Sequence, residues 1–178
     1  MEDGKFEKPI KILIDGHKVL TEQAQEVVDM QSKETKAAID KLFLIMKQTG
    51  AMGFAAPQIG IPLRIFIFSS YPHVNHEDAP QVEPTVVINP IIHTFSNSKE
   101  NWEKCYSLPG KRGLVPRFEE IIVSYTQKDG QRIDNLKLSG FPAELFQHEY
   151  DHLKGLLYTA RNLVELITDE EYKNRYVK

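Results

Sequence analysis

The stretch FQHEYDHLKG, residues 146–155, decides how the rest of the chain is interpreted. It contains the pattern His-Glu-x-x-His, formed by His148, Glu149 and His152. A spacing of one helical turn brings both histidines onto one face, where two imidazoles can bind a single divalent metal ion. Glu149 can then reach a water on that ion without being a ligand itself. The stretch therefore predicts a metal-binding helix, although two histidines that merely decorate a polar helix would give the same letters.

The third protein ligand of such a catalytic ion must come from elsewhere in the chain. Metzincins would continue with a third histidine, but Tyr158 stands at that position. A downstream glutamate is one option, and Glu165, Glu170 and Glu171 are available. The other option is Cys105, the single cysteine, whose thiolate would be a strong ligand. A lone cysteine is also a common apolar filler, so spacing alone leaves the third ligand open.

The composition limits the class of protein. With 178 residues, 41% of them hydrophobic, we expect one domain over residues 1–178. Within it, roughly the last 17 residues should form a C-terminal helix or tail. The chain has no apolar run of about 18 residues, and its start, MEDGKFEKPIKIL, has no signal-peptide or transit-peptide pattern. We therefore expect a cytoplasmic location without membrane contact, most simply in a bacterium, with an organelle or a phage as open alternatives. The net charge of -3 does not call for nucleic acid as a partner.

The remaining patterns predict an α+β fold. Helix boundaries are marked by Ser32 and Gly50 for a helix over 33–48, Pro142 and Gly155 for the motif helix, and Thr168 with Glu171 for a short last helix. Strands are expected at 63–69, 85–90 and 91–95, and as a hairpin of 119–127 and 131–139 that turns at Asp129–Gly130. Loops are expected at 49–62 and 71–84, and a short helix near Thr21–Val28 in an otherwise irregular N-terminal stretch.

Two further stretches carry a resemblance to a known family. GFAAPQIG, residues 53–60, and WEKCYSLPGKRGLVPR, residues 102–117, precede QHEYDH. Together the three resemble the motifs of peptide deformylases, in the same order and at similar spacing. The resemblance covers most of residues 36–160. It implies the peptide-deformylase fold, with antiparallel strands around the His-Glu-x-x-His helix.

The resemblance also implies roles for individual residues. Cys105, His148 and His152 would bind one divalent metal ion, which is Fe²⁺ in the family and can be replaced by Zn²⁺, Ni²⁺ or Co²⁺. Glu149 would act as general base and acid. The expected oxyanion donors are the side-chain amide of Gln58 and the backbone N–H of Tyr106, and the expected substrate-binding residues are Gly53, Arg112 and Met52, the last lining a pocket for an apolar side chain.

The function implied is removal of the formyl group from the N-terminal formylmethionine of nascent polypeptides. Its partners would be formylmethionyl peptides, with a transient contact to the ribosome. Two alternatives stay open: a related hydrolase that acts on another N-acyl or formyl-amide substrate, and a low-activity binding protein with the same fold.

Several residues depart from the family pattern or have competing interpretations. Ala51 and Lys104 replace motif glycines, and Tyr106 follows the cysteine, which puts the substrate range in question. Asp151 could orient a histidine, cap a backbone group or face solvent. Glu103 could pair with Arg112, or both could be solvated. The loop residues His73, His76, Glu77 and Asp78 could suggest a metal cluster, but an exposed polar loop is the preferred interpretation.

Overall fold

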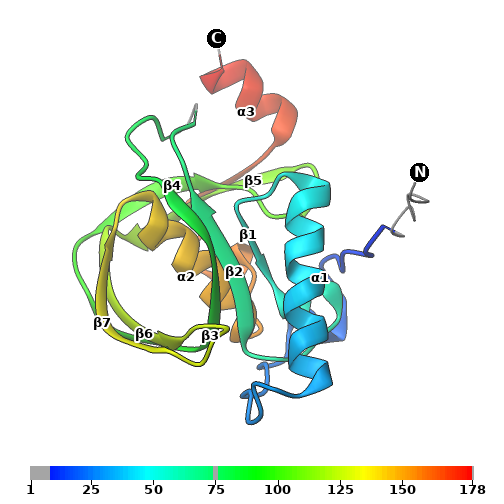
Figure 1. The fold of residues 1–178 in the computed structure, drawn as a ribbon. Helices are drawn as coiled ribbons and strands as arrows, with labels where there is room; N and C mark the ends of the chain where they lie inside the picture. The colour runs from blue at the N-terminus through cyan, green and yellow to red at the C-terminus, as the bar shows by residue number, and fades with distance from the viewer. Residues whose placement is uncertain (1–8, 74–75, 178) are drawn as a thin grey trace, which may run out of the picture.

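The chain folds into two antiparallel β-sheets packed around one helix, as seen in a computed structural model that describes residues 9–73 and 76–177 (Figure 1). The larger sheet has the order β1-β2-β3-β6-β7, and the smaller one the order β4-β5-β8. The larger sheet consists of β1 (Gly53–Ala55), β2 (Ile65–Ser70), β3 (Val82–Phe95), β6 (Glu120–Thr126) and β7 (Arg132–Ser139), and the smaller one of β4 (Ser98–Glu103), β5 (Lys111–Phe118) and β8 (Glu165–Thr168). The expectations about the chain start fall partly on residues 1–8, outside the described residues.

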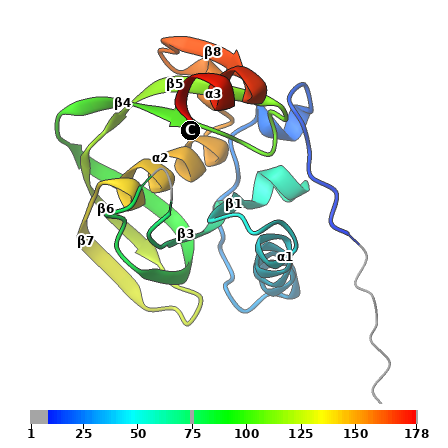
Figure 2. The same ribbon diagram turned by 90° about the horizontal axis from the view of Figure 1, so that it is seen from above.

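The motif helix α2 (Phe141–Leu153) lies between the two sheets, and the larger sheet curves around it (Figures 1 and 2). The Phe146 side chain of this helix is fully buried. Its ring centroid lies 4.9 Å from that of Phe66 and 5.8 Å from that of Phe68. Burial of one such side chain contributes about 1.5–3 kcal/mol. Gln147 links the helix to β5 by two hydrogen bonds. Its amide N–H donates to the Phe118 carbonyl at 2.8 Å, and its amide oxygen accepts from the Phe118 N–H at 3.0 Å.

Helix α1 (Lys33–Thr49) covers the outer face of the same sheet. The Thr35 N–H donates to the Ser32 hydroxyl at 3.1 Å, and Gly50 ends the helix at φ 68°. Both boundary predictions are thus confirmed. With α1 on one face and α2 on the other, every residue of β2 is buried. The part of the sheet next to α2 is therefore packed between helices on both faces.

The N-terminal stretch does not contain the helix expected near Thr21–Val28. It has a short 3₁₀ helix, η1 (Lys18–Leu20), and then runs extended against other elements. The Ala24 N–H donates to the Leu153 carbonyl at 3.0 Å, so the segment is tied to the end of α2. At the same place a Cβ on Gly155 would meet the Thr21 carbonyl oxygen at 2.7 Å. These tertiary contacts use the backbone groups that a helix would have needed.

Other strand predictions need correction. The segments expected as two strands form one strand, β3, in which Asn89 has φ 49° and the register shifts. The side chain of Asn89 exchanges two hydrogen bonds with the backbone of Val27, at 3.0 and 2.9 Å, which supports this conformation. The loop expected at 49–62 contains β1 and a 3₁₀ helix, η2 (Ala56–Ile59). Strands β4, β5 and β8 lie outside the predicted set, whereas the β6–β7 hairpin is confirmed.

The C-terminal helix α3 (Asp169–Tyr176) lies beside β5 and β8 (Figure 2). Thr168 and Glu171 form the expected capping box. A further 3₁₀ helix, η3 (Tyr158–Ala160), follows α2. Within the described ranges, the helices are all too short or too polar to cross a membrane.

Candidate active site

Three distant segments meet at the inner face of α2. The loop between β4 and β5 brings Cys105, and α2 brings His148 and His152. One potential ligand atom from each lies within 4.8 Å of the others, and all three residues are buried. The Cys105 sulfur is 3.4 Å from His152 Nε2. One thiol and two imidazoles form a ligand set that suits a divalent metal ion and leaves a fourth position open.

The downstream glutamates lie elsewhere. Glu165 is on β8 and pairs with Arg175 at 2.7 Å, and Glu171 caps α3. Neither belongs to the Cys-His-His cluster. Of these candidates, Cys105 is therefore the one that lies beside both histidines.

Two observations show that these residues fit a metal ion together with a water or substrate. The Nδ1–H of His148 donates to Glu103 Oε2 at 2.7 Å, which leaves Nε2 of this ring free as a ligand. Glu149 is also buried, and its Oε2 has no hydrogen-bond partner among the described residues. A buried carboxylate oxygen without a partner is costly, and a water bound in the site would satisfy it.

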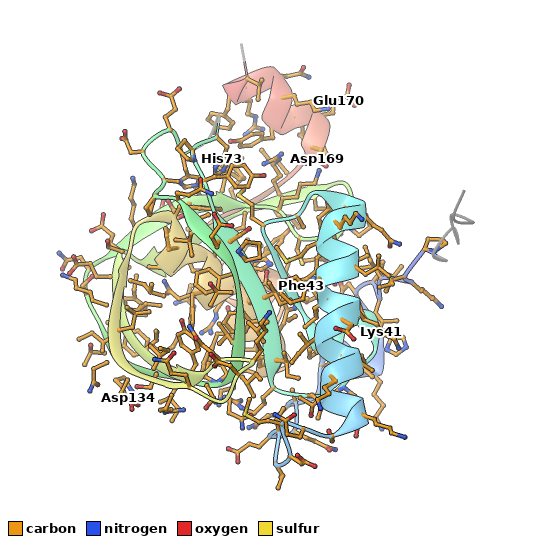
Figure 3. The ribbon with its side chains drawn as sticks, in the orientation of Figure 1. Lys41, Phe43, His73, Asp134, Asp169 and Glu170 are labelled. Carbon is orange, nitrogen blue, oxygen red and sulfur yellow. The ribbon has the colours of Figure 1, made fainter. Side chains whose placement is uncertain are left out.

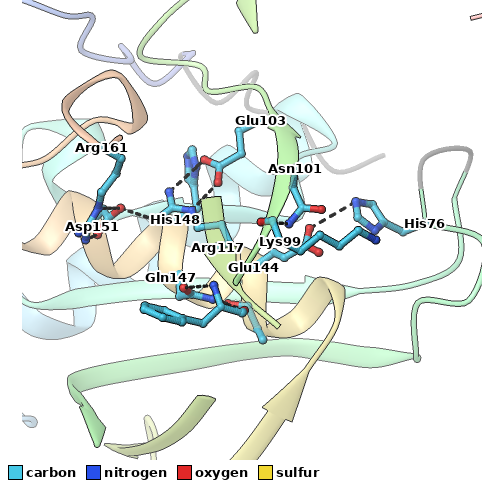
Figure 4. Close-up of polar contacts among 12 residues, drawn as sticks. His76, Lys99, Asn101, Glu103, Arg117, Glu144, Gln147, His148, Asp151 and Arg161 are labelled. Carbon is cyan, nitrogen blue, oxygen red and sulfur yellow. Dashed lines mark hydrogen bonds and ion pairs between the residues drawn. The ribbon is translucent and has the colours of Figure 1, made fainter. Parts of the chain in front are cut away.

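Behind the cluster, Glu103, Arg117, Asp151 and Arg161 form a set of ion pairs that we call the paired network (Figure 4). The Arg117 guanidinium bonds Glu103 at 2.5 Å and Asp151 at 2.6 Å, and Arg161 also donates to Asp151. Asp151 is 2% exposed, so solvent exposure is the wrong interpretation for it. Glu103 pairs with Arg117 and not with Arg112. Burial would raise the pKa of Glu103, but Arg117 and the bond from His148 outweigh it and lower this pKa to about 2.

Gln58 reaches the cluster from η2. Its Oε1 accepts from the Ala55 N–H at 2.9 Å, which turns the amide nitrogen inward. That nitrogen lies 3.5 Å from the Cys105 sulfur and 3.3 Å from the Ser107 hydroxyl. Residue 58 therefore presents an N–H donor beside the potential ligands, where the motif comparison expected one.

Glu149 faces β1 across a very short gap. A Cβ on Gly53 would lie 2.5 Å from Glu149 Oε1, so only glycine fits opposite this carboxylate. Burial raises the pKa of Glu149 to about 7, with the positive charge of His148 acting in the opposite direction. Positive φ angles of non-glycine residues occur in the described chain at Asn89 and Asn135, so Ala51 carries no such strain.

The cluster opens into a pocket of about 270 Å³. The expected substrate-binding residues Met52, Gly53 and Arg112 all line it, as does Tyr106. The Tyr106 hydroxyl donates to the Thr49 carbonyl at 3.0 Å, so this group is engaged within the protein.

At the rim of the pocket, two cations share one carboxylate. Arg112 Nε donates to Asp169 at 2.9 Å, and Lys104 pairs with the same carboxylate at 3.0 Å. The Arg112 guanidinium also lies 4.1 Å from the ring centroid of Tyr172. The charge that Lys104 adds next to the cysteine is therefore paired with the start of α3, in a carboxylate that it shares with Arg112.

The pocket also receives residues that the sequence did not single out as functional. His73 and His76, from the loop expected to be exposed, line it together with Phe141 and Glu144 of α2. Figure 3 shows His73 at the same end of the molecule as Asp169. These histidines do not join the Cys-His-His cluster. No local pattern predicts this position, because it depends on how the loop folds back over α2.

A helix that supplies two histidines and a glutamate, a buried cysteine beside them and an adjoining pocket define the class of mononuclear metallohydrolases. Comparison with known proteins then narrows the class. The profile of the family described as polypeptide deformylase matches residues 9–166. The chain belongs to this family and is a metallohydrolase that removes the N-terminal formyl group of nascent peptides.

Individual relatives agree with this assignment over most of their length. The chain is 37% identical to peptide deformylase 2 of Nostoc sp. over 166 residues, which is 92% of each protein. It is 42% identical to peptide deformylase 1 of Bordetella pertussis over 151 residues, 84% of this chain and 85% of that protein. The crystal structure of the class I type b peptide deformylase from Acinetobacter baumannii, bound to Met-Ala-Ser, matches with a TM-score of 0.80 and 33% identity, over 86% of this chain and 98% of that one. The expected fold is confirmed.

Proposed function

We propose that Cys105 Sγ and one ring nitrogen each of His148 and His152 hold one divalent metal ion at which formyl peptides are hydrolysed. The observation that carries this proposal is the buried Cys-His-His cluster next to a buried carboxylate in one pocket. When bound, a divalent ion supplies Lewis acidity, which lowers the pKa of water toward neutrality and polarises the formyl carbonyl. From the family resemblance we propose Fe²⁺ as the ion in cells, with Zn²⁺, Ni²⁺ and Co²⁺ as substitutes.

Glu149 is the proposed general base and acid. Its Oε2 is buried without a partner in the described structure, so it is free to accept a proton from the attacking water. The same oxygen then returns this proton to the leaving amine nitrogen as the carbon–nitrogen bond breaks. The water oxygen ends in formate, and the peptide leaves with a free N-terminal amine.

The developing oxyanion needs hydrogen-bond donors that are already oriented. The Gln58 amide is held by the Ala55 N–H, so its N–H groups do not have to reorient during the reaction. The backbone N–H of Tyr106 is the second proposed donor. Loss of one such donor typically costs about 3–4 kcal/mol of transition-state stabilisation.

The peptide itself is proposed to lie along β1. This strand is at the edge of the larger sheet, so one side of its backbone is available to pair with an extended peptide. Gly53 would supply these backbone contacts, with Met52 and Arg112 on the pocket wall. Met-Ala-Ser bound to the Acinetobacter relative supports a short peptide as the ligand. The cellular partners we propose are nascent chains in a bacterial cytoplasm, met through a transient ribosome contact.

The proposal is tested by formate release from formyl-Met-Ala-Ser with anaerobically prepared, Fe²⁺-loaded protein. Glu149→Gln should lower kcat/KM by about 10²–10⁴-fold, because general acid–base catalysis is lost, while the metal content stays the same. The matched control Glu26→Gln changes an exposed glutamate and should leave kcat/KM unaltered. Equal rates for wild type and Glu149→Gln would reject Glu149 as the base.

The metal ligand is tested separately by metal analysis of Cys105→Ala. We expect the variant to lose stoichiometric metal, since two imidazoles alone form an incomplete site. Unchanged metal content and activity would show that another residue is the third ligand.

A further inference from the structure

A second pocket borders α2 on a different side from the pocket of the active site. It has a volume of about 170 Å³ and, among the described residues, shares no lining residue with the active-site pocket. Strands β3 and β5, helix α2 and the residue after η3 surround it. We call it the rear pocket, and its walls include Ile92, Phe95, Phe118, Tyr150, Asp151 and Arg161. No step of the proposed hydrolysis uses it.

Aromatic side chains form the apolar wall of the rear pocket. The rings of Phe95 and Phe118 pack with their centroids 4.4 Å apart, and Tyr150 adds a third aromatic side chain from α2. Phe95 is 55% exposed, so this wall is reached from solvent. An apolar cavity of about 150 Å³ is large enough for benzene, and the rear pocket therefore has room for one aromatic ring.

Two cations lie beside Tyr150. The Arg64 guanidinium carbon is 5.8 Å from the centroid of the Tyr150 ring, and Lys154 Nζ is 5.6 Å from it. Over the described ranges, no acidic side chain forms an ion pair with either cation. Arg64 Nη1 is buried without a hydrogen-bond partner in the same ranges, and Lys154 is exposed. The charge around the rear pocket therefore favours an anionic ligand.

Arg161 lies where the rear pocket meets solvent. Its side chain is 41% exposed, and its Nε and Nη2 donate to the two carboxylate oxygens of Asp151. Asp151 also accepts a hydrogen bond of 2.6 Å from Arg117, so this carboxylate is served by two guanidinium groups. A ligand carboxylate can therefore bind Arg161 without leaving Asp151 unpaired, and a guanidinium suits a carboxylate in a bidentate arrangement.

The same arginine is the exposed end of the paired network (Figure 4). From Asp151 the network continues through Arg117 to Glu103, whose Oε2 accepts from His148 Nδ1 at 2.7 Å. A ligand that draws Arg161 from Asp151 leaves this carboxylate to Arg117. The Arg117 guanidinium then binds Asp151 more strongly and Glu103 less strongly, which loosens the support of the His148 ring.

We propose that the rear pocket binds a small organic anion with one aromatic ring, and that the paired network transmits its binding to His148. The ring lies between Phe95 and Tyr150, and the carboxylate of the ligand accepts hydrogen bonds from Arg161. Binding lowers kcat because the ring of His148 is held less firmly. It leaves KM unchanged because the peptide occupies a different pocket. The effect on kcat rests on the proposed function, whereas the binding itself does not.

Binding is tested by NMR titration of the diamagnetic, Zn²⁺-loaded protein with phenylacetate, with phenylacetamide as the uncharged ligand of the same shape. We expect shifts at Phe95 and Tyr150, and phenylacetamide should bind about tenfold more weakly than phenylacetate. Arg161→Gln should weaken phenylacetate binding about tenfold, and Arg161→Lys should restore part of it. Phe95→Ser changes an exposed wall residue and should also weaken binding, which keeps the test decisive if Arg161→Gln does not fold. The control Arg175→Gln changes an exposed arginine and should leave Kd unaltered.

The coupling is tested by formate release from formyl-Met-Ala-Ser with the Fe²⁺-loaded protein. Saturating phenylacetate should lower kcat about two- to tenfold with KM unchanged. Arg161→Gln should have a similarly reduced kcat and no longer respond to phenylacetate, while Arg161→Lys should regain part of the rate. Arg175→Gln should respond like wild type.

Competitive inhibition that persists in Arg161→Gln would place phenylacetate at the Cys-His-His cluster and overturn the proposal. Equal binding of phenylacetate and phenylacetamide, or no shift at Phe95 and Tyr150, would overturn it as well. Binding at these residues without a change in kcat would overturn the coupling to His148. A wild type that releases no formate defeats the proposed function instead, and the titration then decides on its own whether the rear pocket takes an anion.

Discussion

The buried carboxylates on the two sides of His148 differ in how completely they are paired with cations. Behind the histidine, each carboxylate of the paired network accepts hydrogen bonds from the Arg117 guanidinium. On the pocket side, the Glu144 carboxylate has one histidine, His76, at 3.7 Å. The pKa values follow: that of Glu103 is lowered to about 2 by Arg117 and His148 against the effect of burial, while burial raises that of Glu144 to about 7.

This difference separates carboxylates that position other residues from a carboxylate that is available to bind a ligand. Carboxylates whose acceptor sites are filled by the protein hold their neighbours in place, and here they hold the ring of His148. A carboxylate with unfilled sites contributes nothing comparable to the fold and remains available to a ligand. Three variants test whether the two sides behave in these two ways.

The largest effect is expected at the centre of the paired network. Arg117→Leu removes the guanidinium shared by Glu103 and Asp151 and leaves both carboxylates buried and underpaired. We expect a loss of about 3–5 kcal/mol in the free energy of unfolding, measured by urea denaturation. Arg132→Leu breaks an exposed pair with Asp134 and is the control, with an expected loss below about 1 kcal/mol. Similar losses in both variants would contradict a positioning role for the network.

An effect of intermediate size and opposite sign is expected for Glu144→Gln. Because burial raises the pKa of Glu144 from 4.5 to about 7, the folded protein holds this proton more tightly than the unfolded chain. Both states are protonated below pH 4.5, so the cost of Glu144 appears as pH rises through this range and is complete above about pH 7. The variant should therefore match wild type near pH 4 and exceed it by up to about 3 kcal/mol at pH 8.

Urea denaturation of both proteins at a series of pH values measures this difference. A stability difference that does not change with pH would show that the Glu144 carboxyl is not in the environment described. A variant less stable than wild type at pH 8 would show that the carboxylate is better paired than the 3.7 Å contact indicates.

The smallest effect is expected at the rim. Asp169→Asn weakens the pairs with Lys104 and Arg112, which are partly exposed and therefore contribute about 0.2–1 kcal/mol each. Arg112 keeps its position over the Tyr172 ring, so the KM for formyl-Met-Ala-Ser should rise by only a few fold. A loss of stability as large as that of Arg117→Leu would mean that the rim, too, belongs to the positioning part of the site.

The helices and the hairpin were predictable because their signals are local. Ser32, Thr168 and the Asp129–Gly130 turn each fix their element through neighbours a few residues away, and the structure has these elements as expected. Strand β3 was predicted as two short strands, 85–90 and 91–95, whereas the Val27 backbone stabilises the irregular Asn89 within one strand. That stabilising contact is distant in sequence and leaves no local signal.

The same distinction applies to the site. His148 and His152 are recognisable from their spacing. Cys105 was one open option for the third ligand as the single cysteine, and motif comparison alone favoured it and supplied Gln58, because nothing in their spacing predicts that they meet. The pairing of Glu103 with Arg117 and the position of His76 beside Glu144 depend on side chains from separate elements. They could be found only once the sheets and the loop were placed.

The contact between the first and last parts of the chain has a consequence for when the enzyme becomes active. The segment Thr21–Ala24 packs against the end of α2, which is synthesised about 130 residues later. The Cys-His-His cluster likewise joins residues from separate segments, so folding depends on contacts of high sequence separation. While α2 is still inside the ribosome, the chain lacks two of the three cluster residues. Uptake of a metal ion would therefore be a late event that marks a finished molecule, and a truncated translation product would remain without activity.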